Sequence, residues 1–378
     1  MMVKFIHTAD WHLGMQAHFL PVEARVRFAQ DRFDAVRRIA ELAREEECAF
    51  VAVAGDIFDS NHVHPQVVAK AVDALSSFTV PVFLLSGNHD PLDPSSIFRT
   101  AAWTERSPAN ITVLEDSTAI PVPGVEGVEV VGFPWHAKRQ LSDPVAECYD
   151  AARSVDGALR VVIGHGVVDE LGPDADDPSL IGAARIRDAL ESGKVHYLAL
   201  GDRHSVTEIS GSNGRAYYSG TPVATNYGET DPNKVLLVAL DAQACTVERR
   251  TVGTWVFDRQ SRDLNGEEDV KALEQWLDAI PSKHTTAVKL ALRGTLSLAD
   301  SAMLDDVQER NRMTFASLNA WELHSDLVVA PDEADFAKLD IAGYAREALE
   351  DLREEAASSG EEAVVARDAL NLLYRLAQ

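Results

Sequence analysis

The sequence predicts an α/β fold in which two β-sheets lie face to face between layers of helices, a four-layer α/β/β/α sandwich. Three observations favour it. Apolar runs of strand length alternate with helical patterns near the start of the chain, polar clusters follow the strand ends, and later strands continue where helices are sparse. Such alternation is typical of α/β layered folds. With 378 residues the chain is long enough for two or three domains.

The start of the chain predicts strand, helix, strand, helix and strand in turn. These elements cover residues 3–8, 24–46, 50–54, 65–77 and 81–85. Each strand ends in a polar cluster, and ligands of α/β folds bind at the carboxyl ends of strands. We therefore expect a functional site at these ends.

Further strands are expected in the middle of the chain. They cover residues 111–113, 128–133, 160–164, 197–200, 216–219 and 235–240. Because helices are sparse in this region, we expect these strands to add a second sheet that packs on the first.

The sequence changes in character after Trp255. The expected elements are a polar loop at residues 258–266, helices at 267–280 and 298–311, and strands at 286–292 and 318–329. Residues 341–376 predict two helices broken at Ser358-Ser359-Gly360. We predict a large domain over residues 1–253, a small α+β capping domain over 254–335 and a C-terminal helical segment over 336–378.

The composition limits the possible functions. A hydrophobic content of 46% and a charged content of 25% are globular values. A net charge of −25 excludes a protein that holds nucleic acid through bulk positive charge, and it disfavours binding to anionic membranes. It still permits a nucleic-acid enzyme with a local basic patch or bridging metals.

Cysteine usage and apolar runs bear on the compartment. Cys48, Cys148 and Cys245 are scattered and form no CxxC pair, so neither a disulfide framework nor a thiolate metal site is expected. No secretory signal is visible before Asp10, and the longest apolar runs are far below the roughly 20 residues that span a bilayer. We expect a cytoplasmic protein with no membrane partner.

Five clusters of potential metal ligands follow strand-like runs. They are His7-Thr8-Ala9-Asp10-Trp11-His12-Leu13-Gly14, Ala54-Gly55-Asp56-Ile57-Phe58-Asp59, Ser86-Gly87-Asn88-His89-Asp90, Gly164-His165-Gly166 and Ala199-Leu200-Gly201-Asp202-Arg203-His204. Taken alone, a Gly-Asp pair is usually a turn and a His after a strand is usually packed or solvated. Taken together, they place carboxylate, imidazole and carboxamide groups beside glycines, which permit close backbone approach.

This mixed set of ligands suits manganese, iron or zinc, and does not suit a metal selected by thiolates. It is large enough for two ions, which lie roughly 3.5–4 Å apart in two-metal sites and clamp the attacking and leaving oxygens of a phosphate displacement. One carboxylate must then bridge them. Two ions also supply locally the positive charge that an acidic protein needs in order to act on a polyanion.

In this order the clusters resemble the DxH, GD, GNH, GH and GHxH motifs of the calcineurin-like metallophosphoesterase superfamily. The strings His-Thr-Ala-Asp-Trp-His-Leu-Gly, Gly-Asp-Ile-Phe-Asp-Ser and Ser-Gly-Asn-His-Asp are similar to its DNA repair exonuclease branch, the SbcD-type nuclease subunits. Tyr218-Ser219-Gly220-Thr221-Pro222, followed by Gly228-Glu229, is similar to the end of that branch's catalytic domain. The resemblance covers residues 3–240 and implies a metallophosphoesterase sandwich, with a catalytic domain over residues 1–253.

The resemblance also implies a role for each matching residue. The first metal would be held by Asp10, His12 and His204, the second by Asn88, His165 and Asp202, and Asp56 would bridge them. His89 matches the histidine beside the scissile phosphate, which stabilises the transition state or protonates the leaving oxygen. The nucleophile would be a water whose pKa the metals lower. Manganese is the expected metal, with magnesium, iron and zinc as alternatives.

Asp202 departs from the family pattern, which has His at this position. Aspartate is a harder and shorter ligand, so we expect a second site that favours manganese or magnesium over softer metals. The alternative is that Asp202 is a turn residue and the second site is weak or empty. Asp59 and Asp90 are candidates for orienting a ligand histidine or for capping a helix, and His7 is expected in the core.

The C-terminal helices carry an apolar stripe. It consists of Leu349, Leu352, Ala356, Val364, Leu370 and Leu373. It predicts either a hairpin that packs on its own chain or a dock for a partner helix. The resemblance implies an SbcC-type coiled-coil ATPase as a partner near the C-terminus, and a homodimer. The chain has no GxxxxGK[ST] phosphate loop, so it does not supply that ATPase itself.

Three functions fit these residues. The first is a manganese-dependent DNA repair nuclease, a 3′→5′ exonuclease with endonuclease activity as a second expectation. The second is a small-molecule phosphodiesterase or phosphatase of the same superfamily, and the third is a metal-stabilised scaffold without catalysis. The capping domain favours the first over the second, and the intact ligand set argues against the third. The net charge of −25 argues against the first.

Overall fold

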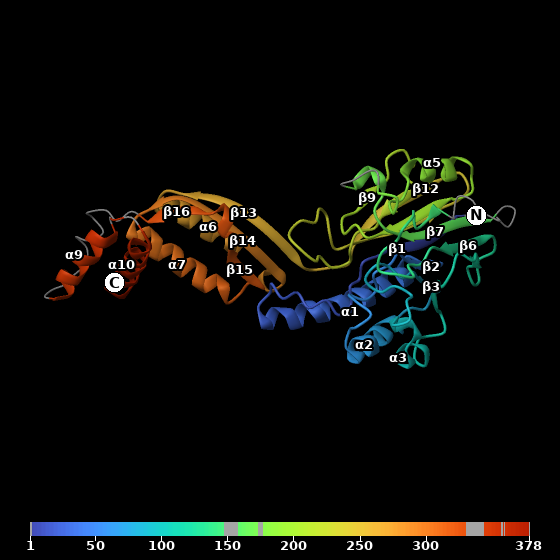
Figure 1. Ribbon diagram of the computed structural model, residues 1–378, viewed down its shortest axis with the longest axis horizontal. Helices are drawn as coiled ribbons and strands as arrows, with labels where there is room; N and C mark the ends of the chain where they lie inside the picture. Colours follow the sequence, from blue (N-terminus) through green and yellow to red (C-terminus); the bar gives the residue numbers. More distant parts are fainter. Residues whose placement is uncertain are drawn as a thin grey trace. The chain divides into compact units, whose positions relative to one another are not determined.

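The structure is a computed structural model. It describes residues 2–146, 158–172, 177–329, 344–356, 358 and 360–377. Its contacts divide the chain into two compact units, Met1–Trp255 and Val256–Gln378, which Figure 1 colours along the sequence. The finer division of the chain at residues 254 and 336 stays a prediction.

The first sheet of the N-terminal unit has the strand order β12-β11-β1-β2-β3-β4. Its strands are β1 (Val3–Thr8), β2 (Phe50–Val53), β3 (Val82–Leu84), β4 (Ile111–Val113), β11 (Lys234–Leu240) and β12 (Cys245–Thr251). Strands β1 to β4 are parallel, and β11 runs antiparallel to β1. The carboxyl ends of β1, β2 and β3 therefore lie along one edge of this sheet.

The second sheet has the order β5-β6-β7-β8-β10-β9. Its strands are β5 (Ile120–Pro121), β6 (Val128–Gly132), β7 (Leu159–His165), β8 (Tyr197–Gly201), β9 (Thr207–Glu208) and β10 (Ala216–Tyr218). Strands β6, β7, β8 and β10 are parallel, so the ends of β7 and β8 also lie side by side.

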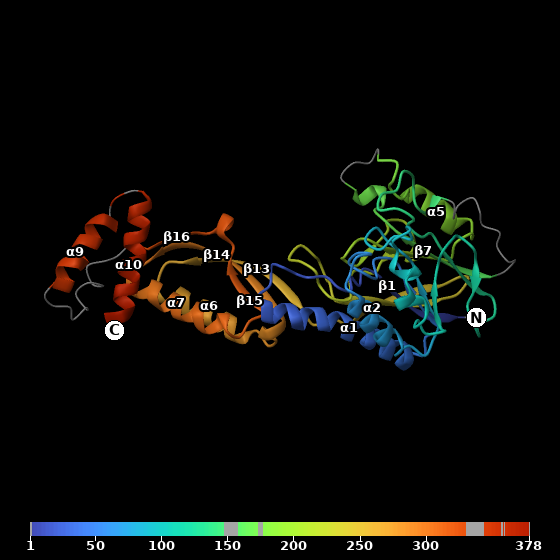
Figure 2. The same cartoon turned by 60° about the horizontal axis from the view of Figure 1, so that its bottom comes forward.

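Helices cover the outer face of each sheet (Figures 1 and 2). On the first sheet lie α1 (Val22–Glu45), α2 (Pro65–Leu75), η1 (Ile97–Arg99) and α3 (Ala101–Thr104), and on the second lie η2 (Asp169–Leu171) and α5 (Ala183–Glu191). Local sequence sets where α2 begins: Pro65 occupies its first turn, and the His64 side chain accepts the backbone N–H of Gln66 at 3.2 Å. Helix α1 buries Phe33, Ile39 and other residues at helical spacing against the sheet.

Three separate apolar layers fill this unit. Ile6 and Ile39 belong to the layer between the first sheet and its helices, and Phe5 belongs to the layer between the two sheets. Val161 also faces the other sheet, whereas the next residue, Val162, faces α5. Successive strand residues thus serve opposite faces, as the two-residue period of a strand requires. Three layers between four sets of elements confirm the predicted α/β/β/α sandwich.

The C-terminal unit is built on a parallel sheet with the order β13-β14-β15, and β16 also pairs with β14. Its elements are β13 (Val256–Leu264), α6 (Glu267–Ala279), η3 (Lys283–Thr285), β14 (Thr286–Leu296), α7 (Leu298–Arg312), β15 (Ser317–Ala320), η4 (Glu322–His324), β16 (Asp326–Val329), α9 (Tyr344–Ala356) and α10 (Glu361–Ala377). Helices α6 and α7 pack on one face of the sheet through Leu273, Leu290 and Val307. The unit combines helices and strands as expected, but its strands are parallel and alternate with helices, so it is an α/β unit and not the predicted α+β one.

The prediction of a loop at residues 258–266 is wrong. β13 spans Val256–Leu264 and pairs with β14 along its whole length. Its backbone groups are satisfied by β14, while polar side chains such as Arg259 and Ser261 are exposed. A strand with so few apolar residues lacks the alternation by which a strand is predicted. The charged edge strand β12 was not predicted for the same reason, and the short helix α5 was also not predicted.

The apolar stripe of the last two helices packs on its own chain. Leu349, Ala356 and Leu370 are buried together with Leu298 and Ala302 of α7. Val364 is 51% exposed. The side chain of Leu373 lies outside the described residues. A hairpin that covers α7 therefore accounts for the buried part of the stripe.

Two further expectations concern thiols and membranes. Cys48 is a buried free thiol, whose pKa burial raises to about 11, and Cys148 lies outside the described residues. Within the described ranges, no helix combines the length and the apolar character that crossing a bilayer requires.

A buried ion pair inside the second sheet offers a test of this packing. Arg160 on β7 donates to Glu129 Oε1 on β6, through Nε at 2.7 Å and Nη2 at 2.6 Å. Both side chains are buried. Because Glu129→Ala leaves a buried guanidinium without this carboxylate, we expect it to lower the free energy of unfolding by about 3–5 kcal/mol, measured by urea denaturation.

Asp73 provides the control. It pairs with Arg37 at 2.6 Å on the surface, so Asp73→Ala should cost less than about 1 kcal/mol. Equal costs for the two substitutions would contradict the assignment of Glu129 as a buried, charge-compensating residue.

Candidate metal centre

Strand ends from both sheets meet at one place in the N-terminal unit. β1, β2 and β3 of the first sheet lead to Asp10, Asp56 and Asn88, and β7 and β8 of the second lead to His165 and Asp202. The two sheets are joined here by direct contacts, such as the backbone N–H of Asp202 donating to Asp10 Oδ1 at 3.0 Å. All five predicted clusters contribute side chains to this site.

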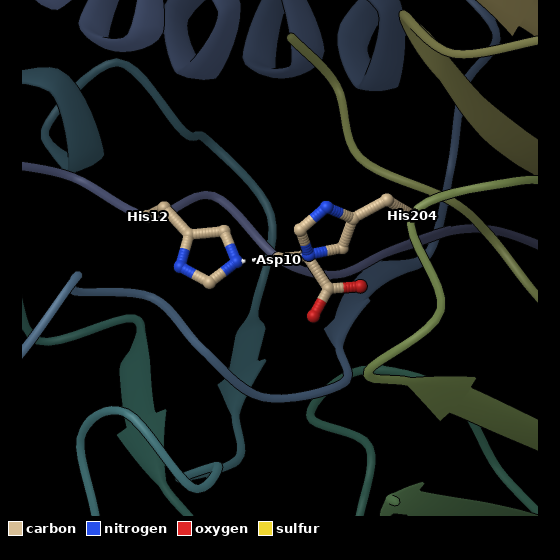
Figure 3. Close-up of side chains that lie close together, drawn as sticks. All are labelled: Asp10, His12 and His204. Atoms are coloured by element: carbon tan, nitrogen blue, oxygen red, sulfur yellow. Dashed lines mark hydrogen bonds between the residues drawn. The ribbon is translucent and has the colours of Figure 1, made fainter. Parts of the chain in front are cut away.

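The first group of side chains is Asp10, His12 and His204 (Figure 3). One ligand atom from each lies within 4.8 Å of the others. The Nε2 atoms of His12 and His204 face each other at 3.1 Å. Two imidazole nitrogens and a carboxylate directed at one spot form a set of donors suited to a divalent ion.

His204 is oriented by two residues that follow β10. Its Nδ1 lies 2.8 Å from Thr225 Oγ1 and 3.0 Å from Glu229 Oε1. Glu229 also accepts the backbone N–H and the hydroxyl of Thr225. A proton on Nδ1 that points at the carboxylate leaves Nε2 free as a ligand. The sequence pattern gave neither residue a role, although Glu229 lies in the segment noted after β10.

The second group surrounds His165 Nε2. Asn88 Oδ1 lies 2.8 Å from this nitrogen, Asp56 Oδ2 lies 3.5 Å from it, and Asp202 Oδ1 lies 3.6 Å from it. The other ring nitrogen, Nδ1, lies 2.8 Å from the carbonyl oxygen of Ala54, to which it donates. In the neutral ring the lone pair is therefore on Nε2, and three oxygens lie around that nitrogen.

Asp56 lies between the two groups. Its Oδ2 is 4.0 Å from His12 Nε2 and 3.5 Å from His165 Nε2, and its Oδ1 accepts the backbone N–H of His89 at 2.9 Å. Gly87 makes room for this carboxylate, because a Cβ at residue 87 would lie 2.1 Å from Asp56 Oδ1. The arrangement is that of a carboxylate able to bridge two ions.

The backbone at the site is unusual. Asp10, His12, Asp56 and Asp202 all have positive φ, at 55°, 43°, 53° and 96°. This left-handed region is uncommon for residues other than glycine, although Asp and His tolerate it better than most. Strained backbone of this kind concentrates at functional sites, where the surrounding structure holds it in place.

The charges of the site fit divalent ions. Burial disfavours a charged His165, yet the carboxylates of Asp56, Asp202 and Asp10 outweigh burial and raise its pKa well above the usual value. Burial raises the pKa of Asp10 to about 7. Burial also lowers the pKa of His12 well below its usual value and keeps the ring neutral, as a metal ligand must be. The donors thus attract positive charge, which protonation of His165 supplies in part.

His89 lies at the mouth of the site. Its side chain is exposed, its Nδ1 lies 2.8 Å from the carbonyl oxygen of Asp59, and its ring centroid lies 4.7 Å from that of His12. Donation from Nδ1 to this carbonyl turns Nε2 away from it. His89 is therefore placed beside the ligand groups, with one nitrogen fixed.

The two predicted supporting carboxylates do different things. Asp59 Oδ1 lies 3.7 Å from Nδ1 of His12, on the opposite side of that ring from the other ligands. Asp90 is buried, and its oxygens accept the backbone N–H groups of Gly87 at 2.8 Å and Phe58 at 3.0 Å. Asp59 is thus placed to orient a histidine, whereas Asp90 joins the loops after β2 and β3.

Asp202 reaches the second group with its side chain and the first group with its backbone. Its carboxylate lies beside His165, and its N–H donates to both oxygens of Asp10, at 3.0 and 3.2 Å. It is both a turn residue and a candidate ligand. Its role as a ligand stays a prediction.

Trp135 is a site residue that sequence reasoning did not identify. Its Nε1 donates to the carbonyl oxygen of His165 at 2.8 Å, and its backbone N–H donates to Ser86 Oγ at 3.0 Å. It follows β6 without a recognisable ligand pattern, so only its tertiary contacts reveal it. By contrast, His7 is a core residue as expected, buried with its ring nitrogens 3.1 Å from Tyr197 Oη and from the Leu200 carbonyl oxygen.

This sandwich, with adjoining Asp, His and Asn groups at its strand ends, is the architecture of a metallophosphoesterase. Residues 3–206 match the calcineurin-like phosphoesterase family. The chain belongs to this family, and its candidate ligand groups support two divalent metals.

Several curated proteins are similar to this chain at low identity. The uncharacterized metallophosphoesterase YhaO of Bacillus subtilis is 25% identical over 78% of this chain and 72% of its own length. The DNA double-strand break repair protein Mre11 of Methanosarcina acetivorans is 24% identical over 74% of this chain and 43% of its own. SbcD of Bacillus subtilis, which is part of nuclease SbcCD, is 24% identical over 60% of this chain and 63% of its own. The chain thus spans less than two thirds of the length of the Mre11 and SbcD relatives.

The hydrogen bond from His204 to Glu229 generates one prediction. Glu229→Gln keeps the size of the side chain but removes the charge that fixes the Nδ1 proton. Loss of such a supporting contact typically weakens metal binding about 10–100-fold, and we expect this for one of two manganese sites in calorimetric titrations. Glu170→Gln, which removes an exposed partner of Arg187, is the control. Identical manganese affinities in all three proteins would rule out a role for Glu229.

Asp202 generates a second prediction. We expect Asp202→Ala to weaken the other manganese site and Asp202→His to restore binding while shifting preference toward zinc, since imidazole is the softer ligand. Competition titrations with the two metals measure both effects. If both variants bind metals as the parent does, Asp202 is not a ligand.

Proposed function

We propose that this protein is a two-metal phosphodiesterase that cleaves DNA during repair, as a 3′→5′ exonuclease and also as an endonuclease. The observation that supports it most is the Asp56 carboxylate, 4.0 Å from His12 Nε2 and 3.5 Å from His165 Nε2. One carboxylate between two ligand groups suits a pair of ions that act on a single phosphate. DNA as the substrate is supported by relatives named as a double-strand break repair protein and a part of a nuclease.

Each ion would have its own ligands and share one carboxylate. The first would be held by Asp10, His12 and His204, the second by Asn88, His165 and Asp202, and both by Asp56. When bound, two divalent ions supply Lewis acidity toward the phosphate and lower the pKa of water toward neutrality. We propose manganese, because oxygen ligands from Asn88 and Asp202 suit harder metals, and magnesium, iron and zinc are the other candidates.

His89 would act on the leaving group. Its Nδ1 is engaged by the Asp59 carbonyl oxygen, and its backbone is tied to Asp56. These two contacts set the direction of the exposed ring. When protonated, its Nε2 can donate a hydrogen bond to a phosphate oxygen or a proton to the departing oxygen.

The acidic character of the chain remains the main argument for another substrate. A net charge of −25 repels DNA at long range. A small phosphodiester or phosphomonoester would meet less repulsion, and this is the alternative function. Two bound ions answer the objection locally, because they add positive charge where the scissile phosphate must lie.

The partner also belongs to the proposal. We propose an SbcC-type coiled-coil ATPase as the partner, on the basis of the similar SbcD protein of nuclease SbcCD, and a homodimer as the assembly. In the described part of α10, Val364 and Val365 are exposed by 51% and 67%. These side chains are available to a partner helix, whereas the buried part of the stripe is used within the chain.

The test is an assay on linear DNA, hairpin DNA and a nitrophenyl diester, each with manganese, magnesium, iron or zinc. We expect shortening of linear DNA from its 3′ ends with manganese. His89→Ala should lower the rate about 10²–10⁴-fold while manganese binding, followed by calorimetry, is kept. His62→Ala removes an exposed histidine close by in the sequence and is the matched control.

The alternatives give different outcomes. Hydrolysis of the diester without DNA cleavage under any metal would show a small-molecule phosphodiesterase. If the parent and His89→Ala are equally inactive on every substrate, the protein is a scaffold.

A further inference from the structure

A cavity of about 510 Å³ opens beside the second ligand group. Asn88 and Asp202 form its wall toward that group, and Trp135, Lys138 and Arg139 are among the residues that form the rest of the wall. It is larger than a single phosphate needs and falls in the size range of cavities that bind small organic ligands. It therefore leaves room for a part of the substrate beyond the scissile phosphate.

Two adjacent cations line this cavity without an acidic partner among the described residues. Lys138 and Arg139 are both exposed, and neither forms an ion pair with any residue that the structure describes. Some other surface arginines are paired: Arg37 pairs with Asp34 and Asp73, and Arg249 pairs with Asp231. In a chain with a net charge of −25, unpaired neighbouring cations beside a candidate phosphate site indicate a place for an anion.

Trp135 supplies a fixed aromatic surface in the same cavity. Its Nε1 donates to the His165 carbonyl oxygen at 2.8 Å, and its carbonyl oxygen accepts the backbone N–H of Leu92 at 2.7 Å. Its backbone N–H is held by Ser86 Oγ at 3.0 Å. An indole fixed in this way loses little freedom when a flat group stacks on it, and nucleic-acid bases stack on such rings.

The wall of the cavity also contains Asp177, which forms no ion pair with Lys138 or Arg139 among those described. Asp177 Oδ1 accepts the backbone N–H of Ser179 at 2.9 Å and its hydroxyl at 2.7 Å. Its carboxylate is thus engaged in its own turn. Asp202 faces His165.

We propose that this cavity binds the nucleotide next to the scissile phosphate, with its base against Trp135 and its outer phosphate against Lys138 and Arg139. The inference rests on the proposed two-metal phosphodiesterase function and adds the class of substrate, a single strand of at least two nucleotides. A simple diester has neither the base nor the second phosphate, so it uses none of these contacts.

The test measures binding before it measures catalysis. Fluorescence anisotropy with a labelled (dT)6 strand, in EDTA and at several salt concentrations, reports on the cavity without metals. We expect the double variant Lys138→Ala/Arg139→Ala to bind about 10–100-fold more weakly than the parent, with a salt dependence that is shallower by about one. The control Arg99→Ala/Arg106→Ala removes the same charge from exposed residues outside this cavity and should bind as the parent does.

The base is tested separately. An abasic strand of the same length and charge should bind the parent at least about fivefold more weakly than (dT)6 does. With manganese, the ratio of kcat/KM for (dT)6 to kcat/KM for bis(p-nitrophenyl) phosphate should fall at least tenfold in Lys138→Ala/Arg139→Ala.

The outcomes separate this inference from the function on which it rests. Binding that depends on Lys138 and Arg139, without any DNA cleavage, would uphold the cavity and overturn the nuclease proposal. DNA cleavage by a double variant whose binding and kcat/KM ratio are unchanged would uphold the nuclease proposal. It would overturn the proposed role of the cavity. Equal losses of DNA affinity in the double variant and in the control would show that only the total charge matters, and would overturn the inference. Equal binding of (dT)6 and the abasic strand would overturn the proposed stacking on Trp135.

Discussion

The position of one carboxylate sets the geometry of the whole site. Asp56 must reach His12 in the first sheet and His165 in the second, and it does so from a strand end with a left-handed backbone. Gly87 has no side chain because Asp56 occupies that space. Parallel strands bring the candidate ligand clusters to one edge of each sheet, and the sandwich brings the two edges together. A change in the register of either sheet would separate the ligands.

Electrostatics gives the molecule its second constraint. Carboxylates are concentrated where a phosphate must bind, and the pKa of His165 is raised because these acids attract any available positive charge. An acidic surface with a few unpaired cations beside the site restricts where a polyanion can settle. On the proposal made above, Lys138 and Arg139 would influence substrate position more than their number suggests.

Patterns of neighbouring residues in the sequence predicted the structural features that depend mainly on those residues. The parallel strands and the five clusters follow from apolar runs that end in Gly, Asp and His, so they could be predicted from the sequence. Glu229 and Trp135 could not, because their roles arise from contacts with His204 and His165 across the fold. Strand β13 was missed because it is stabilised by its pairing with β14 and carries few apolar residues of its own.

The origin of the ligands in two different sheets has a consequence for the lifetime of the protein. A ligand that binds only the folded state adds its binding free energy to the stability of that state. Since the proposed ligands Asp10 and Asp56 follow strands of one sheet, and His165 and Asp202 lie at strand ends of the other, ion binding would oppose the separation of the sheets. The supply of metal in the surroundings would therefore govern resistance to proteolysis and turnover of the N-terminal unit, independently of any reaction it catalyses.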